Sequence, residues 1–482
     1  MDNQSLTSKT INGVGWSFAE TLLRLGITFL VSVVLARLLG PEEYGLIGIL
    51  AIFINLFNAI VDSGFTNALI RKNDITDVDY STVFITNLIV SVALTLLLFF
   101  CSPFIAAFFE RPQLEDLTKV MSIIVIINAF GIVQSAKLTK DINFKVQTKV
   151  SLLSSIISGI VGIGMALIGS GVWALVGQQV SARLLNTLFL FFYNRWIPKL
   201  FFSWISFKEM FGFGWKLMFS TIIATLWNEI YQVVIGKCYS PVTLGYYTRA
   251  HQFSSLCSSN LTAVVQRVSY PVLSSIQDDK LRLKNAYQRI IKTTMLPTFI
   301  LMIGMAAVAN PMVYLLIGSK WLPCVPMLQL LCFNMMLYPL HSLNLNMLQV
   351  EGRSDLYLKL EIIKKIIAVG PIVLGIFVGI YWMLIGSVLM GFVSYYLNAY
   401  YSGQMLDYGM KEQIIDILPS FTIALIMAIV IFSLNYFNIA PFILLPLQIV
   451  VGASIVVFLC CRYSIQEYYE LKNMILSLFK KL

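Results

Sequence analysis

The chain has 482 residues, of which 58% are hydrophobic and only 12% are charged, and its mean hydropathy is +0.80. Soluble domains carry about twice that share of charged residues, so the composition excludes an ordinary soluble protein and indicates a membrane protein. The net charge of +10 is explained by basic cytoplasmic loops and does not require nucleic acid as a partner.

Apolar stretches long enough to span a bilayer recur along the whole chain. Since a spanning helix needs about 20 apolar residues, we expect an all-α, polytopic integral membrane protein with about 14 transmembrane helices. The eighth segment is polar, and Pro326 and Pro339 interrupt the tenth, so a count of 12 remains an alternative. The expected segments are 14–36, 44–66, 81–104, 117–138, 150–169, 171–193, 213–236, 250–272, 293–317, 324–349, 360–379, 381–402, 416–436 and 441–461.

Lysine and arginine gather in alternate loops between these segments. The loop from Lys137 to Lys149 and the tail ending Lys480-Lys481 are basic, whereas the loops on the other side carry few cations. Basic loops resist translocation, so both termini are predicted to lie in the cytoplasm and the number of helices to be even. The seven cysteines lack paired spacing and are expected to be apolar core residues.

This topology predicts the accessibility of position 141, in the basic loop. In a cysteine-free background, Asp141→Cys should stay unlabelled by an impermeant maleimide in intact cells and become labelled after the membrane is opened. Strong labelling in intact cells would overturn the register of all the helices.

Two stretches about 200 residues apart are similar in sequence. Parallel repeats of this kind form transporters in which two lobes rock about a central site. We therefore expect an N-terminal lobe over 1–200 with helices 1–6, a C-terminal lobe over 201–409 with helices 7–12, and helices 13 and 14 with a cytoplasmic tail over 410–482. The matching residues are Gly13, Gly15, Trp16, Pro41 and Gly45 in the first stretch, and Gly212, Gly214, Trp215, Pro241 and Gly245 in the second.

Features of a catalytic protein are missing from the sequence. No expected loop exceeds about 25 residues, no phosphate-binding loop occurs, and His251 and His341 lack the spacing of metal ligands. We predict that the protein is not an enzyme and has no catalytic residue, metal site or cofactor. Coupling to the membrane potential, H⁺ or Na⁺ remains possible.

Charged residues inside the expected spans indicate where function lies, because they are costly in a bilayer. Arg24 lies near the middle of the first helix, one turn beyond Glu20, and Arg183 lies near the middle of the sixth, on the same face as Gln179. Pairing with Glu20 would merely neutralise Arg24, but it leaves Arg183 without a local acidic partner. The two arginines suggest an anionic cargo.

Polar side chains also form stripes of helical period in the first helix, with Glu20, Arg24 and Thr28, and in the second, seventh and eighth helices. Such a stripe either lines a wet cavity or joins neighbouring helices, and stripes in equivalent helices of the two repeats favour a shared cavity. The residues are Asn55, Asn58, Asp62 and Thr66; then Thr221, Thr225, Asn228 or Glu229, and Gln232; then His251, Ser255, Ser259, Thr262, Gln266 and Ser269, with Arg267 beside them.

Four runs of residues resemble the polysaccharide transporter family, the Wzx-type flippases of lipid-linked oligosaccharides. This family shares a superfamily with lipid II flippases and with multidrug and toxin extruders. The runs are Ala36 to Gly45, reading ARLLGPEEYG; Asp62 to Phe65 with Ala68 to Ile70; Leu244 to Ala250, reading LGYYTRA; and Tyr270 to Ser274, reading YPVLS.

The resemblance implies a V-shaped pair of six-helix lobes around a cationic cavity in the bacterial cytoplasmic (inner) membrane. The cargo would be a polyprenyl-diphosphate-linked glycan, flipped to the outer leaflet for surface polysaccharide biosynthesis. Membrane lipid and polysaccharide polymerase machinery would be the other partners. Two alternatives are a drug/cation antiporter of the extruder type and, less favoured, a membrane polymerase or ligase, for which a large outer loop is missing.

Site residues follow from combining the spans with the resemblance. Arginine stays charged away from water and fits phosphate oxygens, while hydroxyl and amide groups suit a glycan. Candidate substrate-binding residues are Arg24, Arg183, Arg249, Arg267, Gln179, Ser255, Ser259, Thr262 and Gln266, and candidate ion-coupling residues are Glu20, Asp62 and Glu229. Helices 13 and 14 are expected mainly to pack against lipid.

Overall fold

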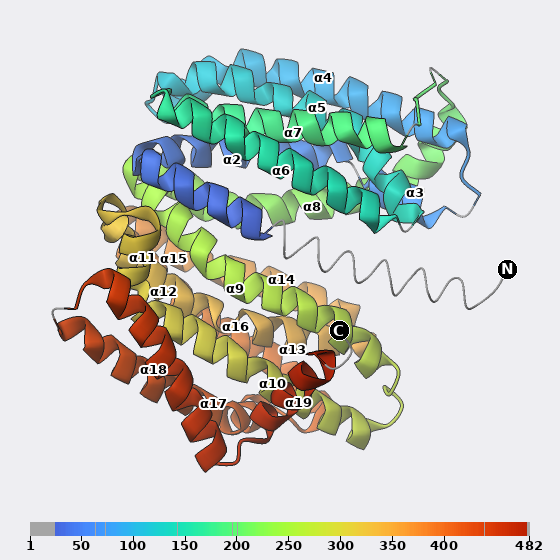
Figure 1. Cartoon of the computed structure of the whole chain (residues 1–482). Coiled ribbons are helices and arrows are strands. Elements are labelled where there is room, and N and C mark those ends of the chain that lie inside the picture. The colour runs from blue at the N-terminus through green and yellow to red at the C-terminus, as the bar shows by residue number, and fades with distance from the viewer. Residues whose placement is uncertain are drawn as a thin grey trace. The chain divides into compact units, whose positions relative to one another are not determined.

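The computed structural model describes residues 25–479 except 63, 73, 142, 195, 200 and 438. Helices take up nearly all of these residues, and none of them belongs to a β-strand (Figure 1). The prediction of an all-α polytopic membrane fold is confirmed. By contact, the chain divides into two compact units, Met1–Gly245 (unit 1) and Tyr246–Leu482 (unit 2).

Ten helices in the described part of the chain are long and apolar enough to cross a membrane. The described part of the first expected span is helical over Leu25–Leu38. Helices also occupy the other expected spans, although some are divided into two. The number of about 14 transmembrane helices stays a prediction.

Unit 1 is built from helices that pack in sequential pairs. The pairs α4 with α5 and α6 with α7 are packed along their lengths, and α2 contacts α5, α7 and α8. A capping box in which the Thr76 and Asp79 side chains accept each other's backbone N–H groups starts α4. The helices are α2 (Pro41–Asp62), α3 (Phe65–Arg71), α4 (Asp77–Phe108), α5 (Gln113–Lys140), α6 (Phe144–Leu167), α7 (Val172–Asn194), α8 (Trp204–Cys238) and the start of α9 (Pro241–Ser274).

Glycine allows α8 to pack closely on the α2–α3 corner. Gly64 takes the left-handed backbone conformation at φ 68°, which suits glycine, and a Cβ on it would lie 2.6 Å from the carbonyl oxygen of Gly214. Because of such contacts, unit 1 includes α8, the helix that begins the second sequence repeat. The expected lobe boundary between residues 200 and 201 stays a prediction.

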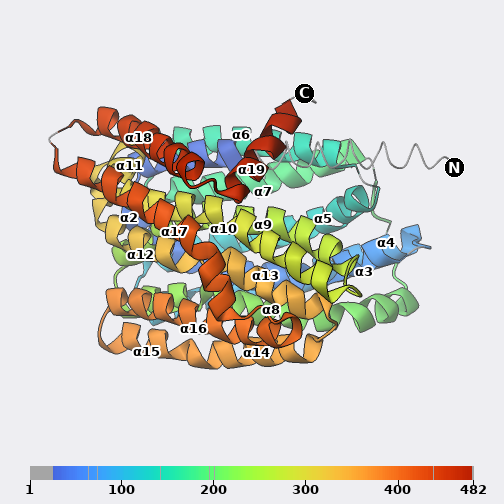
Figure 2. The same cartoon turned by 90° about the horizontal axis from the view of Figure 1, so that it is seen from below.

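Unit 2 contains the rest of α9 and the helices that follow it. Here α10 packs against α12 and α17, and α16 packs against α12, α13 and α15. Figure 2 shows α14 to α16 on one side of α10 and α18 on the other. The elements are α10 (Lys280–Ala307), α11 (Ala309–Ile317), the short 3₁₀ helix η1 (Ser319–Cys324), α12 (Val325–Met335), α13 (Tyr338–Val350), α14 (Ser354–Ile367), α15 (Val369–Phe377), α16 (Ile380–Leu406), α17 (Met410–Ser433), η2 (Leu434–Tyr436), α18 (Pro441–Arg462) and α19 (Gln466–Phe479).

The C-terminal helices are joined to the rest of unit 2 by polar contacts as well as by apolar packing. Arg289 on α10 forms an ion pair with Glu470 on α19 at 2.8 Å. Lys292, one turn further along α10, lies 3.5 Å from Glu467 and 3.6 Å from Asp416. Helices 13 and 14 of the sequence correspond to α17 and α18, so packing against lipid describes only part of their surroundings.

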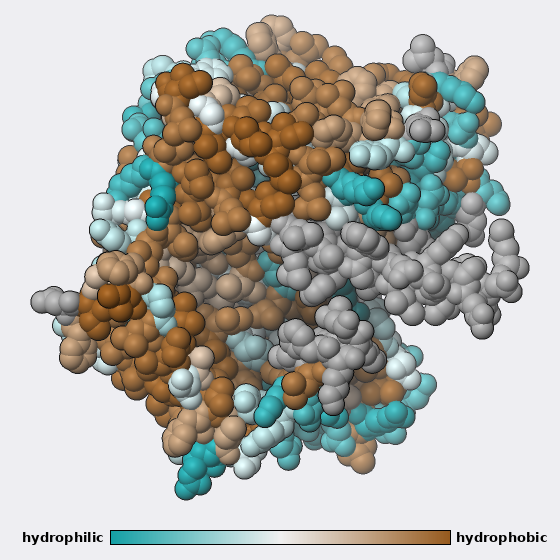
Figure 3. Space-filling view, in the orientation of Figure 1, coloured by the Kyte–Doolittle hydropathy of each residue, from teal (hydrophilic) through white to brown (hydrophobic). Residues whose placement is uncertain are grey.

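The distribution of surface hydrophobicity fits a bilayer around the helices. In unit 1, hydrophobic residues cover the lengths of the helices, and hydrophilic residues gather towards the helix ends (Figure 3). Large apolar side chains on α4 point outward, including Ile89, 63% exposed, and Phe100, 67% exposed. Apolar side chains exposed in this pattern are stable against lipid tails.

Candidate functional site

The predicted polar stripes of α2 and α8 meet at a carboxylate. The Asn55 amide on α2 donates to Oε1 of Glu229 on α8 at 3.0 Å. Gln232, almost one turn along α8, donates its amide N–H to Oε2 of the same carboxylate. Both oxygens of Glu229 are therefore hydrogen-bonded by neutral amides from the two stripes.

Glu229 has no cationic partner in the described part of the chain, where no ion pair involves it. It is half-buried, and it lies inside the candidate membrane span Trp204–Cys238. A carboxylate at such depth is costly unless a cation or proton can neutralise it. This arrangement suits a group that takes up and releases a small cation.

The remainder of the α2 stripe joins helices within unit 1. Asn128 on α5 donates to the amide oxygen of Asn58 at 2.9 Å. The hydroxyl of Thr66 donates to Asp62 at 2.5 Å, across the α2–α3 corner. Asp62 thus lies beside Thr66 and not beside Glu229, and its role in ion coupling stays a prediction.

The two central arginines of the first lobe differ in what the structure shows. Arg24 lies outside the described residues, as does Glu20, so their predicted pairing is left as a prediction. Arg183 is exposed and Gln179 half-buried, one turn apart on α7. Their roles in substrate binding stay predictions.

The stripe on α9 divides into a packed part and an exposed part. The Gln266 amide donates to the hydroxyl of Ser342 on α13, and Asn346, also on α13, donates to Ser269 at 3.4 Å. Thr262 is buried and donates to the backbone of its own helix. The Gln266 and Asn346 contacts join α9 to α13, so the packing interpretation of the stripe holds for this part.

The exposed part of the same helix carries Ser259 and Arg267. Ser255 is half-buried and donates to the backbone carbonyl of Gln252 at 3.2 Å. Arg267 forms no ion pair with any described residue. An exposed guanidinium on α9, without an acidic partner in the described part, is free to bind an anion.

Arg249 has a different environment from Arg267. Its side chain is only 2% exposed and donates to the Gln252 amide oxygen at 2.8 Å. The guanidinium also lies 5.3 Å from the centre of the Trp321 ring, within the range of a cation–π contact. These contacts give Arg249 a packing role between α9 and η1, and its binding of substrate stays a prediction.

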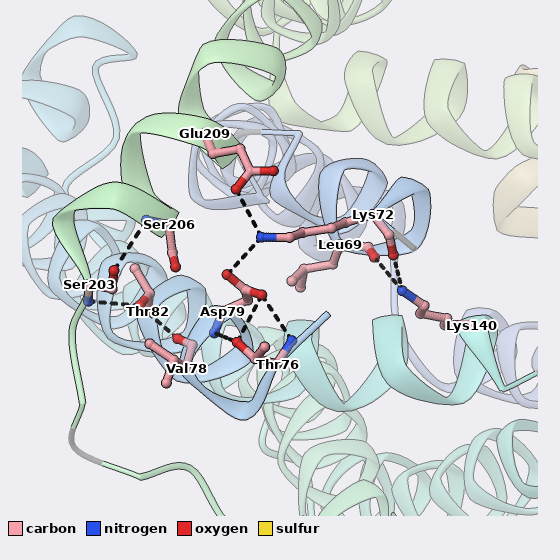
Figure 4. Close-up of polar contacts among 10 residues, drawn as sticks. All are labelled: Leu69, Lys72, Thr76, Val78, Asp79, Thr82, Lys140, Ser203, Ser206 and Glu209. Carbon is pink, nitrogen blue, oxygen red and sulfur yellow. Dashed lines mark hydrogen bonds and ion pairs between the residues drawn. The ribbon is translucent and has the colours of Figure 1, made fainter. Parts of the chain in front are cut away.

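A polar junction that the sequence analysis did not identify lies where α3, α4 and α8 meet in unit 1 (Figure 4). Lys72 forms ion pairs with Asp79 at 3.2 Å and with Glu209 on α8 at 2.9 Å. The backbone N–H of Ser203 donates to Thr82 at 3.0 Å, next to the start of α8. The only signal in the sequence is the spacing of Thr76 and Asp79, which is typical of a capping box.

The charges of this junction support each other. The hydrogen bond to Glu209 raises the pKa of Lys72 above its ordinary value, and Asp79 adds to the rise. The Asp79 side chain is only 2% exposed, so it depends on Lys72 and on the Thr76 backbone N–H for its charge to be tolerated.

Removal of the Lys72 charge should therefore destabilise unit 1. We expect Lys72→Met to lower the free energy of unfolding by about 1–3 kcal/mol, because Asp79 stays buried with one fewer partner. The measurement is thermal unfolding of the purified protein in detergent. The matched control is Lys208→Met, which removes an exposed charge beside Glu209. Equal effects of the two substitutions would show that the ion pairs contribute nothing specific.

The described residues of the predicted site offer groups that bind ions and polar molecules. They contain no cluster of three or more His, Cys, Asp or Glu side chains able to hold a metal ion. They do contain helix-borne amides, hydroxyls, a carboxylate without a cationic partner and an exposed guanidinium. In a helical membrane fold such groups suit the binding of a polar or charged cargo.

Solved structures of membrane transporters share this fold. A lipid II flippase MurJ in an inward closed conformation superposes with a TM-score of 0.74, with 18% identity, over 95% of this chain and 99% of that one. A multidrug resistance MATE family transporter of the MOP superfamily in an inward-facing conformation gives a TM-score of 0.60, with 16% identity, over 80% and 98% of the two chains.

Residues 34–326 match the model of the family described as polysaccharide biosynthesis protein, and the chain belongs to that family. The lipopolysaccharide biosynthesis protein WzxC of Escherichia coli is 25% identical over 77% of this chain and 76% of its own length. The teichuronic acid biosynthesis protein TuaB of Bacillus subtilis is 25% identical over 73% of each chain. The succinoglycan biosynthesis transport protein ExoT of Rhizobium meliloti is 26% identical over 68% of this chain and 67% of its own.

Proposed function

We propose that this protein is a flippase that carries a polyprenyl-diphosphate-linked oligosaccharide from the cytoplasmic to the outer leaflet for surface polysaccharide biosynthesis. The observation that carries the proposal is membership of the polysaccharide biosynthesis family across residues 34–326. The relatives WzxC, TuaB and ExoT are named for polysaccharide biosynthesis, and ExoT is named as a transport protein. The protein is a transporter and not an enzyme.

Arginine side chains bind the cargo diphosphate in this proposal. Arg267 supports this role because it is exposed and lacks an acidic partner in the described part of the chain. Arg24 and Arg183 take the same role from the first lobe, and Arg249 adds positive charge near the start of α9. The planar guanidinium donates two parallel hydrogen bonds to phosphate oxygens, which a lysine cannot do.

Neutral polar groups bind the sugars. Ser255 and Ser259 on α9 and Gln179 on α7 offer the hydroxyl and amide groups that pair with glycan hydroxyls. Thr262 and Gln266, the other predicted candidates, use their polar groups in helix packing in this structure. The lipid tail remains in the bilayer. Membrane lipid and the machinery that polymerises the glycan are the other proposed partners.

Transport is coupled to an ion or to the membrane potential through the carboxylates. Glu229 is the first candidate, because both its oxygens accept bonds from neutral amides and it has no cationic partner in the described residues. Glu20 and Asp62 are the other candidates, and H⁺ and Na⁺ are the candidate ions. The protein lies in the bacterial cytoplasmic membrane with both termini in the cytoplasm.

Purified protein in liposomes tests the function directly. A polyprenyl-diphosphate oligosaccharide with a fluorescent sugar is placed in both leaflets, and an impermeant reagent quenches only the outer pool. We expect the protein to expose the inner pool to the reagent, which empty liposomes do not. An inner pool that stays protected, together with proton-driven uptake of organic cations, would favour an antiporter of the extruder type.

A further inference from the structure

The first turns of α2 and α9 carry the same motif at equivalent places in the two sequence repeats. Each helix begins with a proline, Pro41 or Pro241, and has glycine four residues later, Gly45 or Gly245. All four residues belong to unit 1. The sequence analysis used this motif only as evidence for a repeat.

In the structure the two motifs face each other reciprocally. A Cβ on Gly45 would lie 1.8 Å from the carbonyl oxygen of Pro241, and a Cβ on Gly245 would lie 1.8 Å from the carbonyl oxygen of Pro41. Real Cβ atoms essentially never come within 3.0 Å of such atoms. Only glycine therefore permits this contact, and the same requirement occurs twice, once in each repeat.

An apolar layer lies directly beside the reciprocal contact. Leu244 and Ile49 are completely buried. Gly236 at the end of α8 would place a Cβ 3.2 Å from Ile49, 3.2 Å from Phe109 and 3.4 Å from Leu244. Tight backbone packing over such a layer leaves no room for water.

The contact also lies where the chain passes from one unit to the other. α2 remains within unit 1, whereas α9 continues past Gly245 into unit 2. Movement of α9 relative to α2 must therefore begin by opening this contact. The topology predicted from the basic loops puts the starts of both helices at the outer face of the membrane.

We propose that the reciprocal glycine–proline contact, formed by Pro41, Gly45, Pro241 and Gly245, is the outer gate of the transport path, closed in this structure. When the gate opens, the closely packed backbones of the two helix starts separate. The gate can close again only if positions 45 and 245 carry no side chain. The identity of the cargo rests on the proposed function, whereas the gate itself does not.

Gly45→Ala and Gly245→Ala should each hold the gate open. The test position is Asn55→Cys in a cysteine-free background, because Asn55 is exposed and lies about 15 Å along α2 from Gly45. Labelling by an impermeant maleimide added to intact cells should rise several-fold in both alanine variants. The matched control is Gly164→Ala, whose Cβ would meet nothing within 4 Å, and it should leave labelling unchanged.

A second measurement keeps the native glycines in place. Leu244→Cys should resist the maleimide while no glycan-lipid is being made, and should react when synthesis is switched on. Unchanged labelling at Asn55→Cys in alanine variants that reach the membrane would overturn the gate. Ready reaction of Leu244→Cys before any glycan-lipid is made, with both glycines native, would also overturn it. Opening by the alanine variants without any response of Leu244→Cys to glycan-lipid would uphold the gate and count against the proposed cargo.

Discussion

Arg267→Ala should abolish export of the surface polysaccharide while the protein remains in the membrane. The exposed side chain of Arg267 has no ion pair to lose among the described residues, so its removal should not affect folding. Loss of two charge-assisted hydrogen bonds of about 1.5 kcal/mol each would weaken binding of a diphosphate about a hundredfold. The same loss of export is expected for Arg24→Ala and Arg183→Ala.

The measurement is surface polysaccharide in a deletion strain that carries each variant, with immunoblots of the membrane fraction. Arg267→Lys should restore export only in part, because lysine keeps the charge but loses the bidentate geometry. Arg282→Ala, which removes an exposed charge near the start of α10, is the control and should export normally. Near-normal export by Arg267→Ala, Arg24→Ala and Arg183→Ala would refute the arginine site. The cargo would then be supported by family membership alone.

Elements with strong apolar patterns could be predicted from the sequence. Residues 81–104 and 117–138 lie within α4 and α5 because runs of this length and hydropathy have one stable form in a bilayer. The break in the segment 324–349 falls between Met335 and Tyr338, next to the predicted interruption at Pro339. A proline inside a helix removes a donor and favours such a break.

Contacts between helices were predicted less well, because residue type does not specify the partner. The stripes of α2 and α8 were identified, yet only the fold shows that Asn55 and Glu229 meet while Asn58 bonds to Asn128. A polar side chain at a given depth can line a cavity or join two helices. In this protein Asn55 and Asn58, neighbouring positions of one stripe, join α2 to two different helices.

The attachment of α17 could not be predicted either, since most of its sequence is apolar. Gln413 near its start and Asn344 on α13 are fully buried and exchange two amide hydrogen bonds, each 3.1 Å long. Ser402 on α16 donates to the Asn344 oxygen at 2.8 Å. The single glutamine thus joins α17 to α13, which is distant in sequence, and to Ser402 on the preceding helix α16. The hydropathy of the segment does not indicate these contacts.

Gln413→Leu should therefore destabilise unit 2 far more than a typical surface substitution. Its loss leaves the buried Asn344 amide and the Tyr408 carbonyl each short of one partner, at a cost of about 1–3 kcal/mol per group. Adding Asn344→Leu should recover part of the loss, since two apolar side chains need no partners. Tryptophan fluorescence during heating measures this, with Gln466→Leu, at an exposed position, as the control. The contrary result is an additive one, in which Asn344→Leu lowers the melting temperature by the same amount with and without Gln413→Leu. Such a result would show that the two amides do not act as a pair.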